Sequence, residues 1–254
     1  MARTRTLAQL RGDVCDRADV VDGGTTGRYT TTRLTRYVNE AIQKYQAAVI
    51  ETGGQDWFMK RTGLLTMSTS TTRDAVGWSP NMYVALPSDF LEIIGIDLII
   101  NGRSFPLQQF ERVERTMFQP DPWLVGNNVG QPVYFRIGGT NNSGSKLAQI
   151  IPFAGSAYQY EILYVPVIAD LSADGDTFDG VAGFEEFVID SAAAMILLKD
   201  GNVGTPLYQS IVQSRDEARR DMKFRFSTMA GPGRRMDTER MRINSSWLGR
   251  GDLR

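Results

Sequence analysis

The sequence predicts an α+β protein in which a small helical bundle carries an inserted antiparallel β-rich domain and an extended C-terminal arm. Three observations lead to this prediction. Apolar residues recur at helical spacing near both ends of the chain, short β-branched and aromatic runs alternate with turn residues between them, and MAGPG interrupts the last helical stretch. We therefore expect residues 1–60 and 167–228 to form the bundle from two N-terminal and two C-terminal helices, residues 61–166 to form the insert and residues 229–254 to form the arm.

The two N-terminal helices are each predicted from one apolar face. The first runs from Leu7 to about Ala18, and its apolar residues are spaced by three and four: Leu7, Leu10, Val14 and Ala18. After a loop rich in Gly and Thr, we expect a threonine near Thr31 to cap a longer helix that ends at Gly53 and Gly54. The predicted buried face of this second helix comprises Leu34, Val38, Ala41, Ile42, Tyr45 and Val49.

The middle of the chain contains short runs that are typical of strands. We expect strands at Gly63 to Met67, Tyr83 to Leu86, Leu91 to Ile100, Pro132 to Ile137, Leu147 to Pro152 and Tyr158 to Val165. Asn101-Gly102 predicts a two-residue type I′ hairpin, because both positions of that turn need a positive φ. The insert is also expected to contain a short helix over Gln109 to Phe118 and a loop over Gly138 to Ser145.

The third predicted helix, from Phe184 to Lys199, is apolar on most sides. Such a helix must be surrounded by others, so we expect it at the centre of the bundle with Met195 buried. Lys199 suits the negative end of the helix dipole, and Gly201 suits the C-terminal cap.

The fourth helix is predicted from its start signal, with Thr205 as the N-cap and Pro206 in the first helical position. It should extend to about Phe226. We expect its inner face to comprise Leu207, Ile211, Ala218 and Met222, and its Asp216 to pair with Arg220 one turn later.

Composition excludes several classes of function. The chain has no histidine, so Ser-His-Asp catalysis, Cys-His catalysis and His-ligated zinc are excluded. Its single cysteine, Cys15, lies among helix-patterned residues and is expected to be a buried small hydrophobe. No apolar run is long enough to span a membrane and no secretory signal is seen, so we expect no membrane association and a cytoplasmic site of synthesis. The net charge of −1 gives no overall attraction to nucleic acid.

An acidic segment could hold a cation. The 30 residues from Glu161 to Asp190 contain eight acids and no base, and ADLSADGDTFDG carries four aspartates, Asp170, Asp174, Asp176 and Asp179. The spacing does not match a calcium-binding EF-hand loop. We therefore interpret the acids as residues that turn and solvate a loop, with a cation site as the alternative, and we expect no cofactor, no metal and no catalytic residue.

Eight aromatic residues lie among the strand and turn signals in and just before the insert, where they suit either a core or a binding platform. They are Trp57, Trp78, Tyr83, Phe90, Phe105, Phe110, Trp123 and Tyr134. Core packing is the simpler interpretation. The alternative is a carbohydrate-binding or glycoside-cleaving protein that uses these aromatics with the acidic loop, and a third hypothesis is a nucleic-acid-binding module that uses the C-terminal arm.

The order of the parts resembles that of the head-to-tail adaptor proteins of tailed bacteriophages. The resemblance is carried by TLAQLRGDV followed by LTRYVNEAIQKYQAAV, by YVALPSDFLEIIGIDLIINGRSFPLQQF, and by YEILYVPVIADLSADGDTFDGVAGFEEFVIDSAAAMILL. It implies a non-enzymatic structural protein of the virion, at the head-tail junction, which is present in the host cytoplasm during assembly. It also implies a ring of identical subunits, typically twelve, that binds the portal protein, meets tail or nozzle proteins and extends the channel for genomic DNA without sequence-specific binding.

The C-terminal arm is the candidate docking element for the portal. From Arg225 to Arg254 the chain has seven arginines and three acids, interspersed with apolar residues. Too few of these are apolar to form a core, so we expect the arm to order on a partner's surface. The candidate contacts are Trp247 as the anchor, Ile243 and Leu248 beside it, and Arg234, Arg235, Arg240 and Arg242 as partners for carboxylates.

Overall fold

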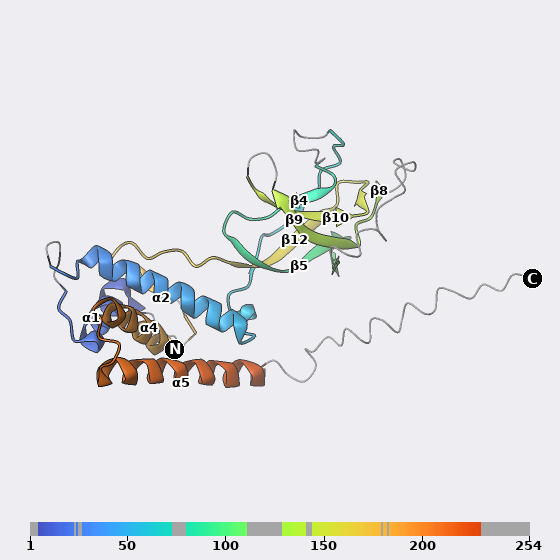
Figure 1. The fold of residues 1–254 in the computed structure, drawn as a ribbon. Coiled ribbons are helices and arrows are strands. Elements are labelled where there is room, and N and C mark those ends of the chain that lie inside the picture. The colour runs from blue at the N-terminus through green and yellow to red at the C-terminus, as the bar shows by residue number, and fades with distance from the viewer. Residues whose placement is uncertain are drawn as a thin grey trace, which may run out of the picture. The chain divides into compact units, whose positions relative to one another are not determined.

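The computed structural model describes residues 5–22, 24, 27–72, 80–110, 129–140, 144–178, 180–181 and 183–229 (Figure 1). Contacts divide the chain into two compact units. Residues 1–54 and 169–254 form one, the helical unit, and residues 55–168 form the other, the β-rich unit. Helices and strands are both present, so the predicted α+β class is confirmed. That the units fold as separate domains stays a prediction.

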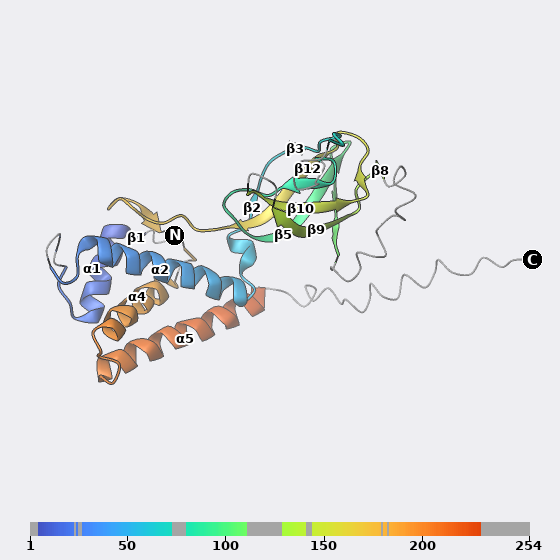
Figure 2. The same ribbon diagram turned by 45° about the horizontal axis from the view of Figure 1, so that its top comes forward.

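Four α-helices make up the described core of the helical unit. They are α1 (Leu7–Ala18), α2 (Thr31–Glu51), α4 (Glu185–Lys199) and α5 (Pro206–Met229). The central helix is α4, which packs against each of the other three, as Figure 2 shows. The faces predicted for the first two helices are buried without exception.

Threonine side chains begin three of these helices. Thr6 and Gln9 form a capping box at the start of α1, each side chain bonding the other residue's backbone N–H. Thr30 caps α2 by accepting a hydrogen bond from the N–H of Arg33, which confirms the threonine cap predicted near Thr31. The hydroxyl of Thr205 accepts from the N–H of Tyr208, 3.3 Å away, which confirms the predicted cap of α5.

The prediction that α4 is surrounded is confirmed, but not for every residue. Eleven of its fifteen residues are buried, so little of the helix faces water. Met195 is only half-buried and Leu198 is 56% exposed, so the expectation of a buried Met195 was wrong. The reason is that α2 and α5 leave a groove open beside these two residues.

The last helix differs from the prediction in three respects. It continues to Met229, three residues beyond the expected end at Phe226. Leu207 is 38% exposed, although Ile211 and Met222 are buried as expected. Asp216 accepts from the guanidinium of the adjacent Arg215 at 2.9 Å, instead of from the predicted Arg220.

A two-stranded sheet joins the start of the chain to the acidic segment. Strand β1 (Arg5–Thr6) pairs antiparallel with β13 (Thr177–Phe178). Two residues are too few to give a periodic signal, so sequence patterning cannot detect these strands. The pairing fixes the acidic segment beside the N-terminus of α1.

The described residues of the β-rich unit form strands and a 3₁₀ turn, η1 (Gln55–Trp57). The strands are β2 (Lys60–Arg61), β3 (Leu65–Thr66), β4 (Tyr83–Ala85), β5 (Phe90–Ile100), β6 (Arg103–Pro106), β7 (Gln108–Gln109), β8 (Val129–Gly130), β9 (Tyr134–Thr140), β10 (Lys146–Ile151), β11 (Phe153–Ala154) and β12 (Gln159–Pro166). One sheet has the order β2-β12-β5-β6 with β3 also on β12, and a second has the order β4-β10-β9-β7. Most strand pairs are antiparallel, as predicted for the insert, but β7 with β9 and β8 with β11 are two short parallel pairs.

The predicted hairpin after β5 is confirmed. Asn101 and Gly102 have φ of 52° and 73°, and Ile100 pairs with Arg103 across the turn. Asn tolerates this left-handed conformation better than most residues, and Gly has no Cβ to oppose it.

Two predictions in the insert fall partly outside the described residues. Gln109 lies in strand β7, which contradicts the start of the expected helix over 109–118, and the rest of that segment is not described. The loop expected from Gly138 begins later, because β9 continues to Thr140.

The core of the β-rich unit draws on both larger sheets. Ile96 and Leu98 of β5, Ile162 of β12, Phe135 of β9 and Ile150 of β10 belong to one buried cluster. Phe90 is also buried there, whereas Phe105 is 44% exposed on the edge strand β6.

Candidate interaction surface of the helical unit

The predicted portal-binding residues follow the last described residue, Met229. Arg234, Arg235, Arg240, Arg242, Ile243, Trp247 and Leu248 therefore lie outside the described residues, and their role stays a prediction. The surfaces that the structure does describe belong to the acidic segment, to an ion-pair network and to a groove between three helices.

Several aspartates of the acidic segment have structural partners, among them Asp176 and Asp174. Oδ2 of Asp176 accepts from the N–H groups of Ser172 and Ala173 at 2.7 and 2.8 Å, and these bonds hold the pKa of its carboxyl below the usual range. Asp174 pairs at 2.7 Å with Arg11 of α1, whose side chain is almost fully buried. Each acid therefore fixes the loop or joins it to a helix.

The same segment is held by Asn39 of α2. Its side-chain amide donates to the carbonyl of Leu171 and accepts from the N–H of Leu171, both at 3.0 Å. Among the residues described, no group of acids is arranged to hold a metal ion; Asp179 is not among them. The interpretation of the acids as loop-forming residues accounts for these contacts.

A network of ion pairs surrounds the N-terminal half of α4. Asp190, whose side chain is fully buried, accepts from the guanidinium of Arg17 and from the hydroxyl of Ser214, the latter at 2.6 Å. Arg17 also pairs with Glu186 at 2.6 Å, and Glu186 pairs with Arg5 at 3.2 Å. The network thus connects β1, α1, α4 and α5.

The pKa of Asp190 is raised from its ordinary value. Burial is the largest cause, and the negative charge of Glu186 adds to it. The hydrogen bond from Ser214 and the positive charge of Arg17 act in the opposite direction without cancelling the effect of burial.

Cys15 is buried in α1, as its pattern predicted. Burial is the main cause that raises the pKa of its thiol, so the reactive thiolate is disfavoured. This position is therefore a packing site rather than a nucleophile.

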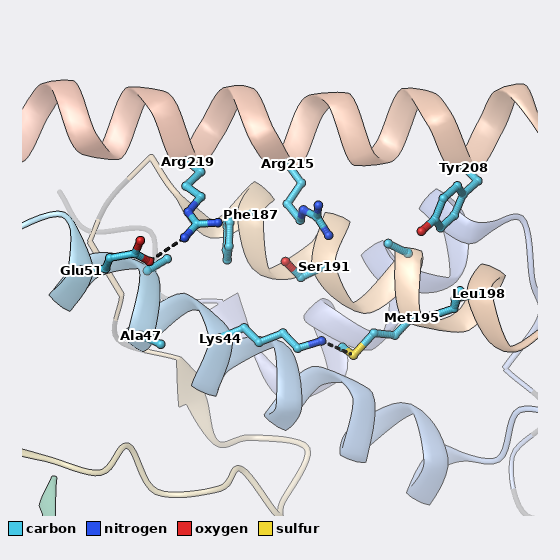
Figure 3. A pocket seen from close by; sticks show the side chains of 12 residues that line it. Lys44, Ala47, Glu51, Phe187, Ser191, Met195, Leu198, Tyr208, Arg215 and Arg219 are labelled. Atoms are coloured by element: carbon cyan, nitrogen blue, oxygen red, sulfur yellow. Dashed lines mark hydrogen bonds and ion pairs between the residues drawn. The ribbon is translucent and has the colours of Figure 1, made fainter. Parts of the chain in front are cut away.

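A groove of about 390 Å³ lies between α2, α4 and α5 (Figure 3). Its apolar floor includes Phe187, Ala194 and Met195 of α4. Lys44 projects into it from α2, and Arg215 projects into it from α5. At one end, Glu51 of α2 and Arg219 of α5 form an ion pair of 2.5 Å.

Sequence reasoning missed this groove, although a signal for it exists. Its α5 lining comprises Tyr208, Arg215 and Arg219, which are spaced by seven and four and so share one helix face. Arginines at such positions suggest a solvated face unless the facing helices are known. Only the packing of α5 across α2 and α4 turns that face into a groove wall.

A family model described as SU10 adaptor protein matches residues 5–239. The chain belongs to this family. No curated protein matches the chain. Family membership confirms the resemblance to phage head-to-tail adaptors, and it assigns the chain a structural role in the bacteriophage virion, in contact with other head or tail proteins.

The SU10 adaptor family assignment does not favour the carbohydrate hypothesis for the β-rich unit. Phe90 and Phe110 are buried, as core residues are, while Trp78 and Trp123 lie outside the described residues. Within the described part of this adaptor chain, no helix has the length and apolar character needed to cross a bilayer.

Proposed function

We propose that this SU10 adaptor family member forms a ring of identical subunits, twelve in number, at the head-tail junction of the virion. The ring binds the portal protein on one side and tail or nozzle proteins on the other. It extends the channel through which genomic DNA passes, it performs no catalysis, and its subunits are present in the host cytoplasm before assembly. The observation that carries the proposal is the family match over residues 5–239.

The match includes part of the arm that we propose as the portal-docking element. It extends ten residues beyond Met229 and so includes Arg234 and Arg235. Arginine contacts at a rim steer association and orientation more than they add net affinity, which suits a docking step between large complexes.

The charge of the chain supports passive passage of DNA. Its net charge is −1, with 28 basic and 29 acidic residues. A channel of strongly basic subunits would bind DNA phosphates and release counterions, which would retard movement of the genome.

Electron microscopy of the purified chain mixed with its portal tests the proposal. We expect rings on the portal, and a chain that sediments chiefly as a monomer when the portal is absent. Portal particles that remain bare at saturating concentrations of the chain would overturn the proposed role.

Binding assays on the purified chain test the carbohydrate-binding and nucleic-acid-binding hypotheses. Binding on a glycan array that is lost in Trp123→Ala would favour a carbohydrate-binding protein. DNA binding by the isolated monomer that weakens as salt rises would favour a nucleic-acid-binding module.

A further inference from the structure

Three cationic side chains line the groove between α2, α4 and α5: Arg219, which pairs with Glu51, and Lys44 and Arg215, which do not. The described partner of the Lys44 ammonium is the Sδ of Met195, 3.1 Å away, and a thioether is only a weak acceptor. Arg215 donates to Asp216 through Nε and Nη2, at 3.1 and 2.9 Å. The Arg215 side chain nevertheless projects towards α4, as Figure 3 shows, so positive charge faces the groove from two helices.

The floor between these cations is apolar and partly open to water. Met195 is half-buried, and Leu198, one turn further along α4, is 56% exposed. The hydroxyl of Ser191 also lines the groove, buried and lacking a hydrogen-bond partner among the residues described. An apolar floor with a small number of placed polar groups is typical of a binding groove.

We propose that this groove binds an acidic segment of another virion protein, which inserts an apolar side chain over Met195 and places carboxylates against Lys44 and Arg215. Charge complementarity selects this occupant. The proposed site is on the helical body and is separate from the arm, so it does not depend on the arm docking to the portal.

The segments of this chain are poorer occupants. The arm, residues 229–254, has six arginines against three acids, so it would bring like charge to Lys44 and Arg215. The acidic segment is already engaged within its own unit, through the pairs of Asp174 with Arg11 and of Glu186 with Arg17. A second copy of the chain offers the same two segments, so a different protein is the better match.

Photo-crosslinking in assembled particles tests the proposal. Met195 is replaced by p-benzoylphenylalanine in the full-length chain, particles are assembled and irradiated, and the crosslinked peptides are identified by mass spectrometry. We expect crosslinks to a segment of another virion protein in which acids flank an apolar residue. Crosslinks to residues 230–254, to a second copy of the chain or to a basic segment would overturn the proposal, as would the absence of crosslinks.

Charge reversal provides the second readout. Adding Lys44→Glu to the crosslinking chain should lower the crosslink yield at least about tenfold, because it places a carboxylate where the proposed partner brings its own. Lys60→Glu is the matched control, since it makes the same change at an exposed residue of the β-rich unit and should leave the yield unchanged. Equal yields from the two variants would overturn the role of Lys44, and retention of the variant chains in particles is measured alongside.

Discussion

At the scale of single residues, Asp190 shows how burial and pairing compete. Its carboxyl is removed from water, yet Arg17 and Ser214 both bond to it. Because its pKa is raised from 3.8, the folded chain holds this proton more tightly than the unfolded chain does. The stability that Asp190 contributes is therefore fully present below pH 3.8 and is lost as pH rises through the folded-state pKa.

Asp190→Asn removes this titration and so isolates it. We expect the free energy of unfolding of the wild type, measured relative to that of the variant, to fall as pH rises above about 4. Urea denaturation of both proteins at a series of pH values from about 3.5 to about 7 checks the prediction. A difference that is constant over the series, or that grows with pH, would contradict it.

Gly54 is a second residue at which a small change, the addition of a Cβ, should alter stability. A Cβ built there would lie 2.7 Å from Cγ1 of Val49 and 3.1 Å from the ring of Phe226. We expect Gly54→Ala to lower the free energy of unfolding by about 1–3 kcal/mol, because packed neighbours must move. Gly12→Ala is the control, since its Cβ meets no atom within 4 Å and a helix interior favours Ala by about 0.5–1 kcal/mol. Equal effects in thermal melts would show that Gly54 is not confined.

At the scale of elements, α4 organises the helical unit. Most of its residues are buried against three helices, whereas Met195 and Leu198 are partly open to water in the groove. One helix therefore combines a large buried surface with a small exposed one, a distinction that its nearly uniform apolar sequence conceals.

Aspartate should destabilise α4 strongly at a buried position and only slightly at a half-buried one. Ile189 is 1% exposed, so Ile189→Asp would bury an unpaired charge. We expect it to lower the free energy of unfolding by more than about 3 kcal/mol. Met195→Asp would place its carboxylate beside the ammonium of Lys44 at a half-buried position, and should change stability by less than about 1 kcal/mol. Soluble yield and urea denaturation measure both effects, and an insoluble Met195→Asp would show that the position is buried after all.

At the scale of the whole molecule, the chain combines a helical unit, a β-rich unit and an arm with different compositions. Most charged residues of the arm are arginines, whereas all charged residues from Glu161 to Asp190 are acids. Acids of this segment pair within the helical unit, as Asp174 does with Arg11 and Glu186 with Arg17, so their charge contributes to the fold.

Removing the arm tests whether its role can be separated from folding. The chain truncated after Met229 keeps both described cores, so we expect a soluble protein with a cooperative melt that no longer attaches to portal-bearing heads. Occupancy is measured as the amount of adaptor that remains bound to purified heads. Trp247→Ala in the full-length chain is a milder variant for the same measurement. Unchanged occupancy of the truncated chain would show that the attachment surface lies on the helical body instead of the arm.

Local features could be predicted from the sequence alone because they depend on neighbours along the chain. The helix from Leu7 to Ala18, the cap at Thr205 and the Asn101-Gly102 turn each follow from a few adjacent residues and their backbone preferences. The family resemblance likewise depended on the order of such elements. The sequence also shows that the arm combines arginines with apolar residues, although their role in docking stays a prediction.

Only the tertiary structure decided which distant residues meet. Arg11 and Asp174 are 163 positions apart, and no periodicity links them. Lys44 and Arg215 face one groove because α2 and α5 both pack against α4. Pairing over such distances depends on how helices pack rather than on local preference, so the sequence predicted the helices but not the surface that they form together.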